Sequence, residues 1–296
     1  MRYIVPTAIT QDMLVSSSAP ETDHAAWAGG TAYAVGDRVI RTSTHSIYER
    51  LVAGTSATAP EDDPINWVRV GPTNRWAAFD QAVGTRTSAA DTLTFSIQPG
   101  VVRGLALLDL DIESATVVMT VDGETVYSRE ILPQQTQEDA DSWYDFFFEA
   151  VQRRSAIVLT DLPPYGEGVI TVTLSGGGSP VSVGTCAVGP MYELGTVLAN
   201  PRIGILDYSK KTTDDFGTTS VTERGYAKRM TLDVLLPTTS VDLATIRLAR
   251  VRARPAVWVA SPRFDALSIY GWLKDWSVSI PGLINSTCSL EIEGLI

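Results

Sequence analysis

The sequence predicts a mainly β protein with a small aromatic-cored β module, a central β-sandwich and a C-terminal β-rich domain with one helix. Short segments alternate apolar and polar residues, which is the pattern of half-buried strands. The 23 glycines and 16 prolines are spread along the chain, as turns between many short strands require. With 296 residues, 44% of them hydrophobic, the chain is long enough for two or three domains with cores of their own.

We expect four units along the chain. Residues 1–25 are a leader that ends in a loop-forming run and can pair as a strand with a later domain or with another subunit. Residues 26–70 form the small module, residues 71–184 the β-sandwich and residues 185–296 the C-terminal β-rich domain. A module of about 45 residues is near the lower limit for independent folding, and since this one contains no cysteine, its aromatic residues must supply the core.

The sandwich strands show the clearest alternation. In residues 92–97, Leu93, Phe95 and Ile97 lie on one face, and Asp122-Gly123 is typical of a hairpin turn. The apolar face predicted for residues 104–113 comprises Ala106, Leu108, Leu110 and Ile112. The opposite face of that strand is predicted to carry Asp109, Asp111 and Glu113. We interpret these carboxylates as a solvated face, with a calcium site as the open alternative. The aromatic run at residues 143–148 is dense enough to be core.

The best helix lies in the C-terminal domain, at residues 241–254. Its apolar residues recur at helical spacing, Ser240 stands at the N-cap position and Pro255 ends the segment. The apolar stripe comprises Val241, Ala244, Leu248 and Val251. A basic stripe beside it comprises Arg247, Arg250 and Arg254. These arginines are either a solvated face or a docking surface for an acidic partner subunit.

Charge and composition exclude several kinds of partner. A net charge of −11 disfavours nucleic acid and anionic lipid, both of which need a basic footprint. Cys186 and Cys288 lie far apart, and we expect two buried thiols, although the spacing leaves a disulfide open. His24 and His45 have no ligand cluster around them, so we expect no metal and no cofactor. Without a signal peptide or a long apolar segment, the chain is expected to be made in the cytoplasm and not to insert into a membrane.

An enzyme is the less favoured interpretation. The chain has no G-x-S-x-G elbow, and the glycines at 176–178 lack the lysine and helix of a phosphate-binding loop. Carboxylate pairs such as Asp62/Asp63 and Asp214/Asp215 leave a glycan depolymerase as a lesser alternative, because glycosidases need only two carboxyl groups. No apolar surroundings that would raise the pKa of one carboxyl group are evident in the sequence.

Residues 27–67 carry the most specific motif. It runs from Trp27 through the stretches 30–33 and 35–39 to Tyr48-Glu49, then to Pro60 and Trp67. This pattern resembles the small chitin-binding or cellulose-binding-type modules of chitinases and phage tail proteins. The resemblance implies carbohydrate binding through the aromatic residues Trp27, Tyr33, Tyr48 and Trp67. In that family two exposed aromatics follow the Tyr-Glu pair, whereas residues 50–54 here have none. The four aromatics are therefore either sugar-stacking or structural.

Other segments are similar to a family of phage tail proteins described as carbohydrate-binding tail or tail-tip proteins. These segments are residues 71–80, 143–149, 159–165, 204–211, 214–217 and 288–295. The resemblance implies a structural component of a tail tip or fibre in the virion, with the C-terminal domain (residues 185–296) and the leader docked to other tail subunits. Its partners would be other phage tail proteins and further copies in a symmetric homo-oligomer, with bacterial surface polysaccharide contacted by the small module. The alternative is a purely structural tail hub or collar protein without sugar binding.

Overall fold

The computed structural model of the chain describes residues 1–133, 154–261 and 264–295. The described residues form several antiparallel sheets and a single α-helix, which confirms the predicted mainly β fold class. No helix among them is long and apolar enough to cross a membrane. The aromatic run at residues 143–148 lies outside the described residues.

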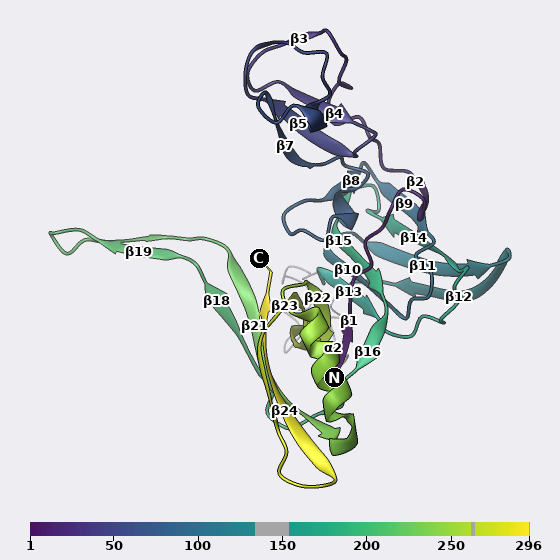
Figure 1. Cartoon of the computed structure of the whole chain (residues 1–296), viewed down its shortest axis with the longest axis vertical. Coiled ribbons are helices and arrows are strands. Elements are labelled where there is room, and N and C mark those ends of the chain that lie inside the picture. The colour runs from purple at the N-terminus through teal and green to yellow at the C-terminus, as the bar shows by residue number, and fades with distance from the viewer. Residues whose placement is uncertain (134–153, 262–263, 296) are drawn as a thin grey trace, which may run out of the picture.

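The central sandwich consists of two packed sheets (Figure 1). The first has the order β13 (Ala156–Leu159), β10 (Gly104–Asp111), β15 (Val181–Gly189), β8 (Thr87–Ala89). The second has the order β12 (Glu124–Ile131), β11 (Ser114–Val121), β14 (Val169–Ser175), β9 (Thr92–Ile97), β2 (Leu14–Ser17). Leu93, Phe95 and Ile97 share the core between them, as predicted. Asp122 and Gly123 make the β11–β12 turn, both with positive φ.

A local irregularity at Asp109 overturns the predicted face of strand β10. Asp109 has φ +54, although the register with β15 is the same on both sides of it, with Leu108 opposite Thr185 and Leu110 opposite Val183. The left-handed backbone at Asp109 interrupts the extended strand, and the alternation of side chains changes face there. The sandwich core therefore receives Leu105 and Leu107 before Asp109, and Leu110 and Ile112 after it. Ala106 and Leu108 face the C-terminal domain instead, so the four residues predicted to share a face do not.

The C-terminal domain is one large sheet covered by a helix (Figure 1). Its order is β16 (Met191–Glu193), β1 (Arg2–Ile4), β22 (Ala256–Val259), β23 (Ser268–Ser279), β24 (Asn285–Gly294), β21 (Tyr226–Pro237), β17 (Thr196–Val197), and β18 (Arg202–Asp207) also pairs with β21. The helix α2 (Val241–Val251) buries the predicted apolar stripe. It ends three residues before the predicted end at Arg254, and the side chain of Ser240 makes no capping hydrogen bond, because Ser240 belongs to the preceding 3-10 turn Thr238–Ser240.

The leader pairs with both later domains. Strand β1 lies between β16 and β22 of the C-terminal sheet, and β2 pairs with β9 of the sandwich. The predicted boundary between residues 184 and 185 falls inside β15, whose strand partners all lie in the sandwich. Both cysteines are free and buried, as expected, and burial raises the pKa of the Cys186 thiol to about 12 and that of Cys288 to about 11.

Two glycines allow the leader to cross the sandwich. Gly104 and Gly189 are opposite each other on β10 and β15. A Cβ atom on Gly104 would lie 2.5 Å from the side chain of Ile4, and one on Gly189 would lie 2.0 Å from the carbonyl oxygen of Val5. Ile4 is fully buried here between the sandwich and the C-terminal sheet. The joint between the two domains thus depends on backbone surface without side chains.

The substitution Gly189→Ala should lower the free energy of unfolding by about 1–3 kcal/mol, because the added methyl group meets backbone rather than a movable side chain. Gly204→Ala on β18 is the matched control, since a Cβ atom there meets nothing within 4 Å. Chemical denaturation of the full chain measures both. Equal stability of the two variants would contradict the close approach of the leader.

Candidate functional site

The small module forms a separate lobe at one end of the molecule (Figure 1). Strands β4 (Arg38–Arg41), β5 (Ser46–Arg50) and β7 (Trp67–Pro72) make a three-stranded sheet, and β3 (Ala32–Tyr33) pairs with β6 (Gly54–Thr55). The β4–β5 turn faces the sandwich, because His45 in this turn stacks on Trp76. The opposite end, where β5 ends and β7 begins, is therefore the distal end of the module.

The four predicted sugar-binding aromatics come together, but as a core. Trp67 and Tyr48 are 2% and 6% exposed, and Trp27 and Tyr33 pack against them half-buried. Tyr33 meets Trp67 edge-on, with ring centroids 5.1 Å apart. The hydroxyl of Tyr33 also accepts a hydrogen bond from the Ala28 amide at 3.0 Å. These contacts supply the core that a module without disulfides needs.

Two arginines cover the indole rings of the module. The guanidinium of Arg50 lies 4.9 Å from the ring centre of Trp67, and that of Arg41 lies 5.0 Å from the ring centre of Trp27. Arg50 is only 2% exposed. A pyranose ring stacks on an open, flat aromatic face. In the described structure neither Tyr48 nor Trp67 offers such a face, and one face of Trp27 is occupied. Sugar binding by these residues therefore stays a prediction.

An ion pair fixes the arginine over Trp27. Arg41 donates hydrogen bonds to Glu61, the shortest at 2.7 Å between Nη2 and Oε1. This hydrogen bonding lowers the pKa of the Glu61 carboxyl and raises that of Arg41. Glu61 belongs to the 3-10 turn Pro60–Asp62, so the pair joins that turn to the sheet. Sequence spacing gave no sign of this contact.

The distal end of the module is aliphatic. Its exposed apolar residues, here called the distal patch, are Val35, Leu51, Val52 and Ile65, and Ile65 is 80% exposed. Two backbone hydrogen bonds of 2.8 Å join the loops that carry them, from Gly36 to Arg50 and from Leu51 to Asn66. Leu51 and Val52 of the patch lie in the segment after Tyr48-Glu49, where the resemblance implies exposed aromatics. The sequence signal for this surface was therefore the pair of aliphatic residues in that segment.

A buried carboxylate links the module to the sandwich. The side chain of Glu21 is 9% exposed and accepts hydrogen bonds from His45 Nδ1 at 3.0 Å and Thr73 Oγ1 at 2.9 Å. Arg75 lies 3.7 Å from its other oxygen. The ring of His45 also stacks on the ring of Trp76, with the ring centres 4.2 Å apart. Sequence reasoning placed His45 in or beside the module but did not predict this joint.

The predicted basic stripe is divided by the fold. Arg247 is half-buried with its guanidinium 5.3 Å from the ring centre of Tyr192. Arg250 and Arg254 are exposed, and neither has an ion-pair partner within the described residues. Leu243 and Ile246 lie on the same outward side of α2 as Arg250, at helical spacing, and about half of each is exposed. This outer face is compatible with docking, which stays a prediction.

The carboxylates of the sandwich do not gather. Asp109 pairs with Arg86 at 2.6 Å between oxygen and nitrogen. Among the residues that the structure describes, no group of three or more His, Cys, Asp or Glu side chains is placed to hold a metal ion. A calcium site made by Asp109, Asp111 and Glu113 is therefore not supported, because the left-handed backbone at Asp109 also separates that residue from the alternation of the other two.

Comparison with known proteins adds no identity: neither a scan against protein-family models nor a search of curated proteins finds a match.

Loss of the Glu21 carboxylate should loosen the module. In Glu21→Gln the charged hydrogen bonds to His45 and Thr73 become neutral, which costs about 1–3 kcal/mol for a buried group. Glu124→Gln is the matched control, because Glu124 is exposed and has no ion pair within the described residues. Limited proteolysis between residues 71 and 76 should be faster in Glu21→Gln alone. Equal cleavage rates in both variants would exclude this joint.

The Arg41–Glu61 pair should make the module sensitive to acid. A carboxyl group whose pKa is lowered in the folded state stabilises the fold at pH values above its unfolded-state pKa, and this contribution is lost as the pH falls through the folded-state pKa. Wild type and Glu61→Gln should therefore differ by about 1 kcal/mol near neutral pH and converge as the pH falls through the lowered pKa of Glu61. Thermal unfolding of the full chain at several pH values measures the difference. A difference independent of pH would rule out the pair as its source.

Proposed function

We propose that the chain is a non-catalytic structural subunit of a bacteriophage tail that holds its small module outward to contact a surface. The observation that carries this proposal is the placement of the module. The module is tied to the sandwich by the Glu21 cluster, while the distal patch at its other end is exposed. The tail assignment itself depends on the resemblance of segments such as residues 71–80 and 204–211.

The body of the subunit supports this role. The leader pairs with both large domains, and Ile4 is buried between them with Ala106 and Val257. A body joined in this way is a continuous base for a projecting module. Contact through the distal patch favours a partner with apolar surface, because exposed aliphatic side chains gain most from contact that excludes water.

A glycan contact is the second candidate. It is favoured by Trp27 and Tyr33, which keep part of their surface exposed. Shallow stacking on one or two rings gives weak binding, about 1–3 kcal/mol per ring by analogy with base stacking. Several copies in a symmetric tail would raise the avidity.

Binding of the full chain to bacterial cells separates the two contacts. We expect Val52→Asp to reduce cell binding about tenfold or more, because it places a charge in the distal patch. Trp27→Phe, which keeps an aromatic ring in the core, should then bind as wild type does. Tyr165→Ala removes an exposed aromatic from the sandwich and is the control. Protease treatment of the cells should abolish a protein contact, and periodate oxidation a glycan contact.

The outcomes are distinct. Binding to chitin or to purified surface polysaccharide that Trp27→Phe weakens and Val52→Asp leaves intact would favour the glycan candidate. Turnover of polysaccharide would contradict the non-catalytic role. Antibody labelling of phage particles from the source strain should mark the tail, and particles without label would overturn the tail assignment.

A further inference from the structure

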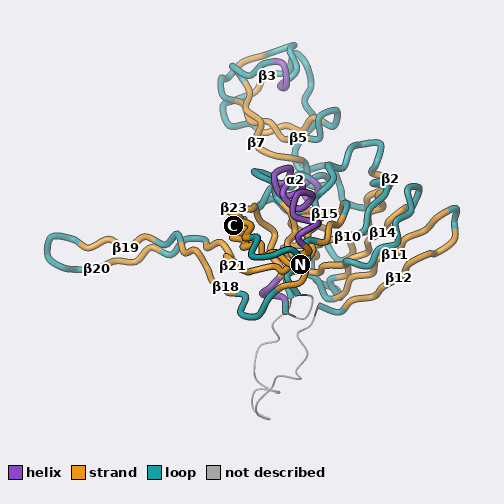
Figure 2. Tube along the Cα trace, turned by 60° about the horizontal axis from the view of Figure 1, so that its bottom comes forward, coloured by secondary structure: helices purple, strands orange, loops and turns teal. Residues whose placement is uncertain are grey.

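The second projection of the molecule is a long two-stranded arm. Beyond the C-terminal sheet, β18 and β21 continue into β19 (Lys210–Thr213) and β20 (Thr219–Thr222), which extend away from the body (Figure 2). Every residue from Arg202 to Tyr226 is exposed except Ser209, which is half-buried. A two-stranded ribbon alone is marginally stable in water. The arm therefore lacks the packing that would stabilise it within one copy.

The tip of the arm presents a single phenylalanine. Asp214 Oδ1 accepts hydrogen bonds from the amides of Phe216 at 3.0 Å and Thr218 at 2.8 Å, and Gly217 adopts φ +82. Hydroxyl pairs support the strands behind it, with Thr212 and Ser220 2.9 Å apart. The turn is thus fixed by its own hydrogen bonds, yet the ring of Phe216 is 94% exposed. A fixed turn that exposes a large apolar ring is suited to insertion into a pocket.

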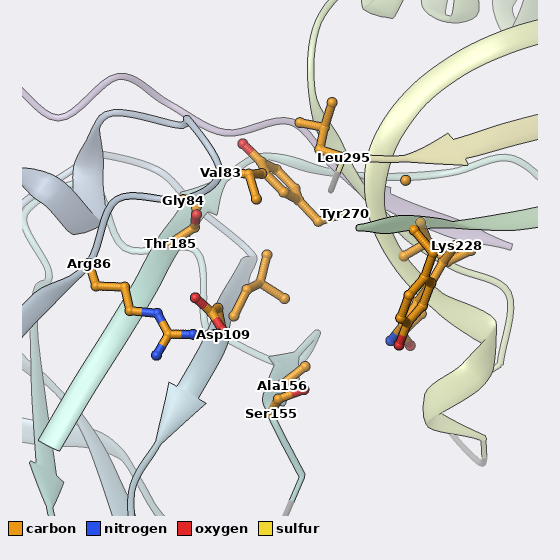
Figure 3. A pocket seen from close by; sticks show the side chains of 15 residues that line it. Val83, Gly84, Arg86, Asp109, Ser155, Ala156, Thr185, Lys228, Tyr270 and Leu295 are labelled. Atoms are coloured by element: carbon orange, nitrogen blue, oxygen red, sulfur yellow. Dashed lines mark hydrogen bonds and ion pairs between the residues drawn. The ribbon is translucent and has the colours of Figure 1, made fainter. Parts of the chain in front are cut away.

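A cavity with suitable chemistry lies between the sandwich and the C-terminal sheet. Its volume is about 550 Å³. Figure 3 shows residues of both domains around it, with Arg86 and Asp109 on the sandwich side and Tyr270 and Lys228 on the other. Its apolar lining comprises Val83, Leu108, Ile269 and Leu295. Lys228 has no ion-pair partner within the described residues.

Charge favours the same pairing of tip and cavity. The tip carries Asp215, which makes no side-chain hydrogen bond or ion pair within the described residues, next to Phe216. The cavity has Lys228 with its charge unpaired, and the carboxylate of Asp109 is already neutralised by Arg86. The apolar ring of Phe216 and the negative charge of Asp215 therefore complement the apolar lining of the cavity and the positive charge of Lys228.

The length of the arm fits a contact between neighbouring copies. Tyr226 lines the cavity at the base of the arm, and it lies ten positions after Phe216 in the sequence. At about 3.3 Å per residue the arm extends about 33 Å from its own cavity. Phe216 therefore lies far outside the cavity of its own chain, and a cavity of this kind is open to it only on another copy.

We propose that Phe216 of one copy inserts into this cavity of the next copy, with Asp215 placed against Lys228 there. The proposal depends on the proposed function only in that a tail subunit assembles symmetrically, and it identifies the contact surfaces. Tip and cavity are different surfaces, so the contact is head-to-tail and closes into a ring when the rotation between copies permits it. The exposed apolar residues along the arm, such as Ile205 and Val221, would lie across the neighbour.

A photo-crosslinking amino acid at position 216 of the full chain tests the contact directly. We expect cross-links between copies, on peptides that contain Val83, Leu108 or Ile269. The same probe at Tyr165, an exposed site on the sandwich, is the control and should give no such cross-links. Cross-links between copies at other surfaces would overturn the proposed cavity, and so would their absence in a chain that sedimentation shows to be oligomeric.

Charge exchange tests the pairing independently. Asp215→Lys and Lys228→Asp should each weaken self-association about tenfold or more, and the double variant should restore it. Failure of restoration while both single variants remain folded would contradict the pairing of Asp215 with Lys228. A wild-type chain that stays monomeric at all concentrations would overturn the arm contact, whereas labelling of phage tails and cell binding by the module would still test the proposed function separately.

Discussion

The close approach of the leader to Gly104 and Gly189 is the constraint on which the body of this protein depends. The two glycines remove side chains from one position on β10 and β15, and the backbone of Val5 and the side chain of Ile4 occupy that space. Strand β1 can then fill the position between β16 and β22, where Tyr3 stacks on Trp258 with ring centres 4.9 Å apart. The C-terminal sheet consequently has a core on each face: α2 covers one, and the sandwich covers the other through Ile4. Both projections extend from this single body.

Local periodicity made much of the fold predictable, and non-local contacts explain most of what was not. The stripe from Val241 to Val251 and the face of residues 92–97 follow from spacing alone, because each buries one side of a regular element. The face of β10 does not follow from spacing, because Asp109 adopts a positive φ that a non-glycine residue rarely takes. No sequence pattern indicated this backbone conformation. The helix likewise ended before Arg254. The leader's pairing was left open for the same reason: strand partners far away in sequence are selected by shape, and here by two glycines.

The candidate site shows a different limit. The sequence correctly grouped Trp27, Tyr33, Tyr48 and Trp67, but it did not show which faces of the rings stay open. That depends on Arg41 and Arg50, which cover two indole rings. A module near the lower size limit of a domain needs its aromatic rings to form a core. Rings that are buried in this core are not available to bind a ligand. Recognition then depends on residues exposed at the surface of the module, which here are the aliphatic residues of the distal patch.

The two projections differ in what they need from other copies. The module has a core of its own, held by Trp67 and tied to the body by Glu21, so it is complete in a single chain. The arm has hydrogen bonds between its strands and a fixed turn at Asp214, but its apolar residues have no cover within one chain. If the arm is stabilised only by contact with a neighbouring copy, its stability depends on the concentration of the protein. Surface contact by the module and assembly through the arm can therefore be separated physically: the first belongs to each subunit, whereas the second exists only between subunits.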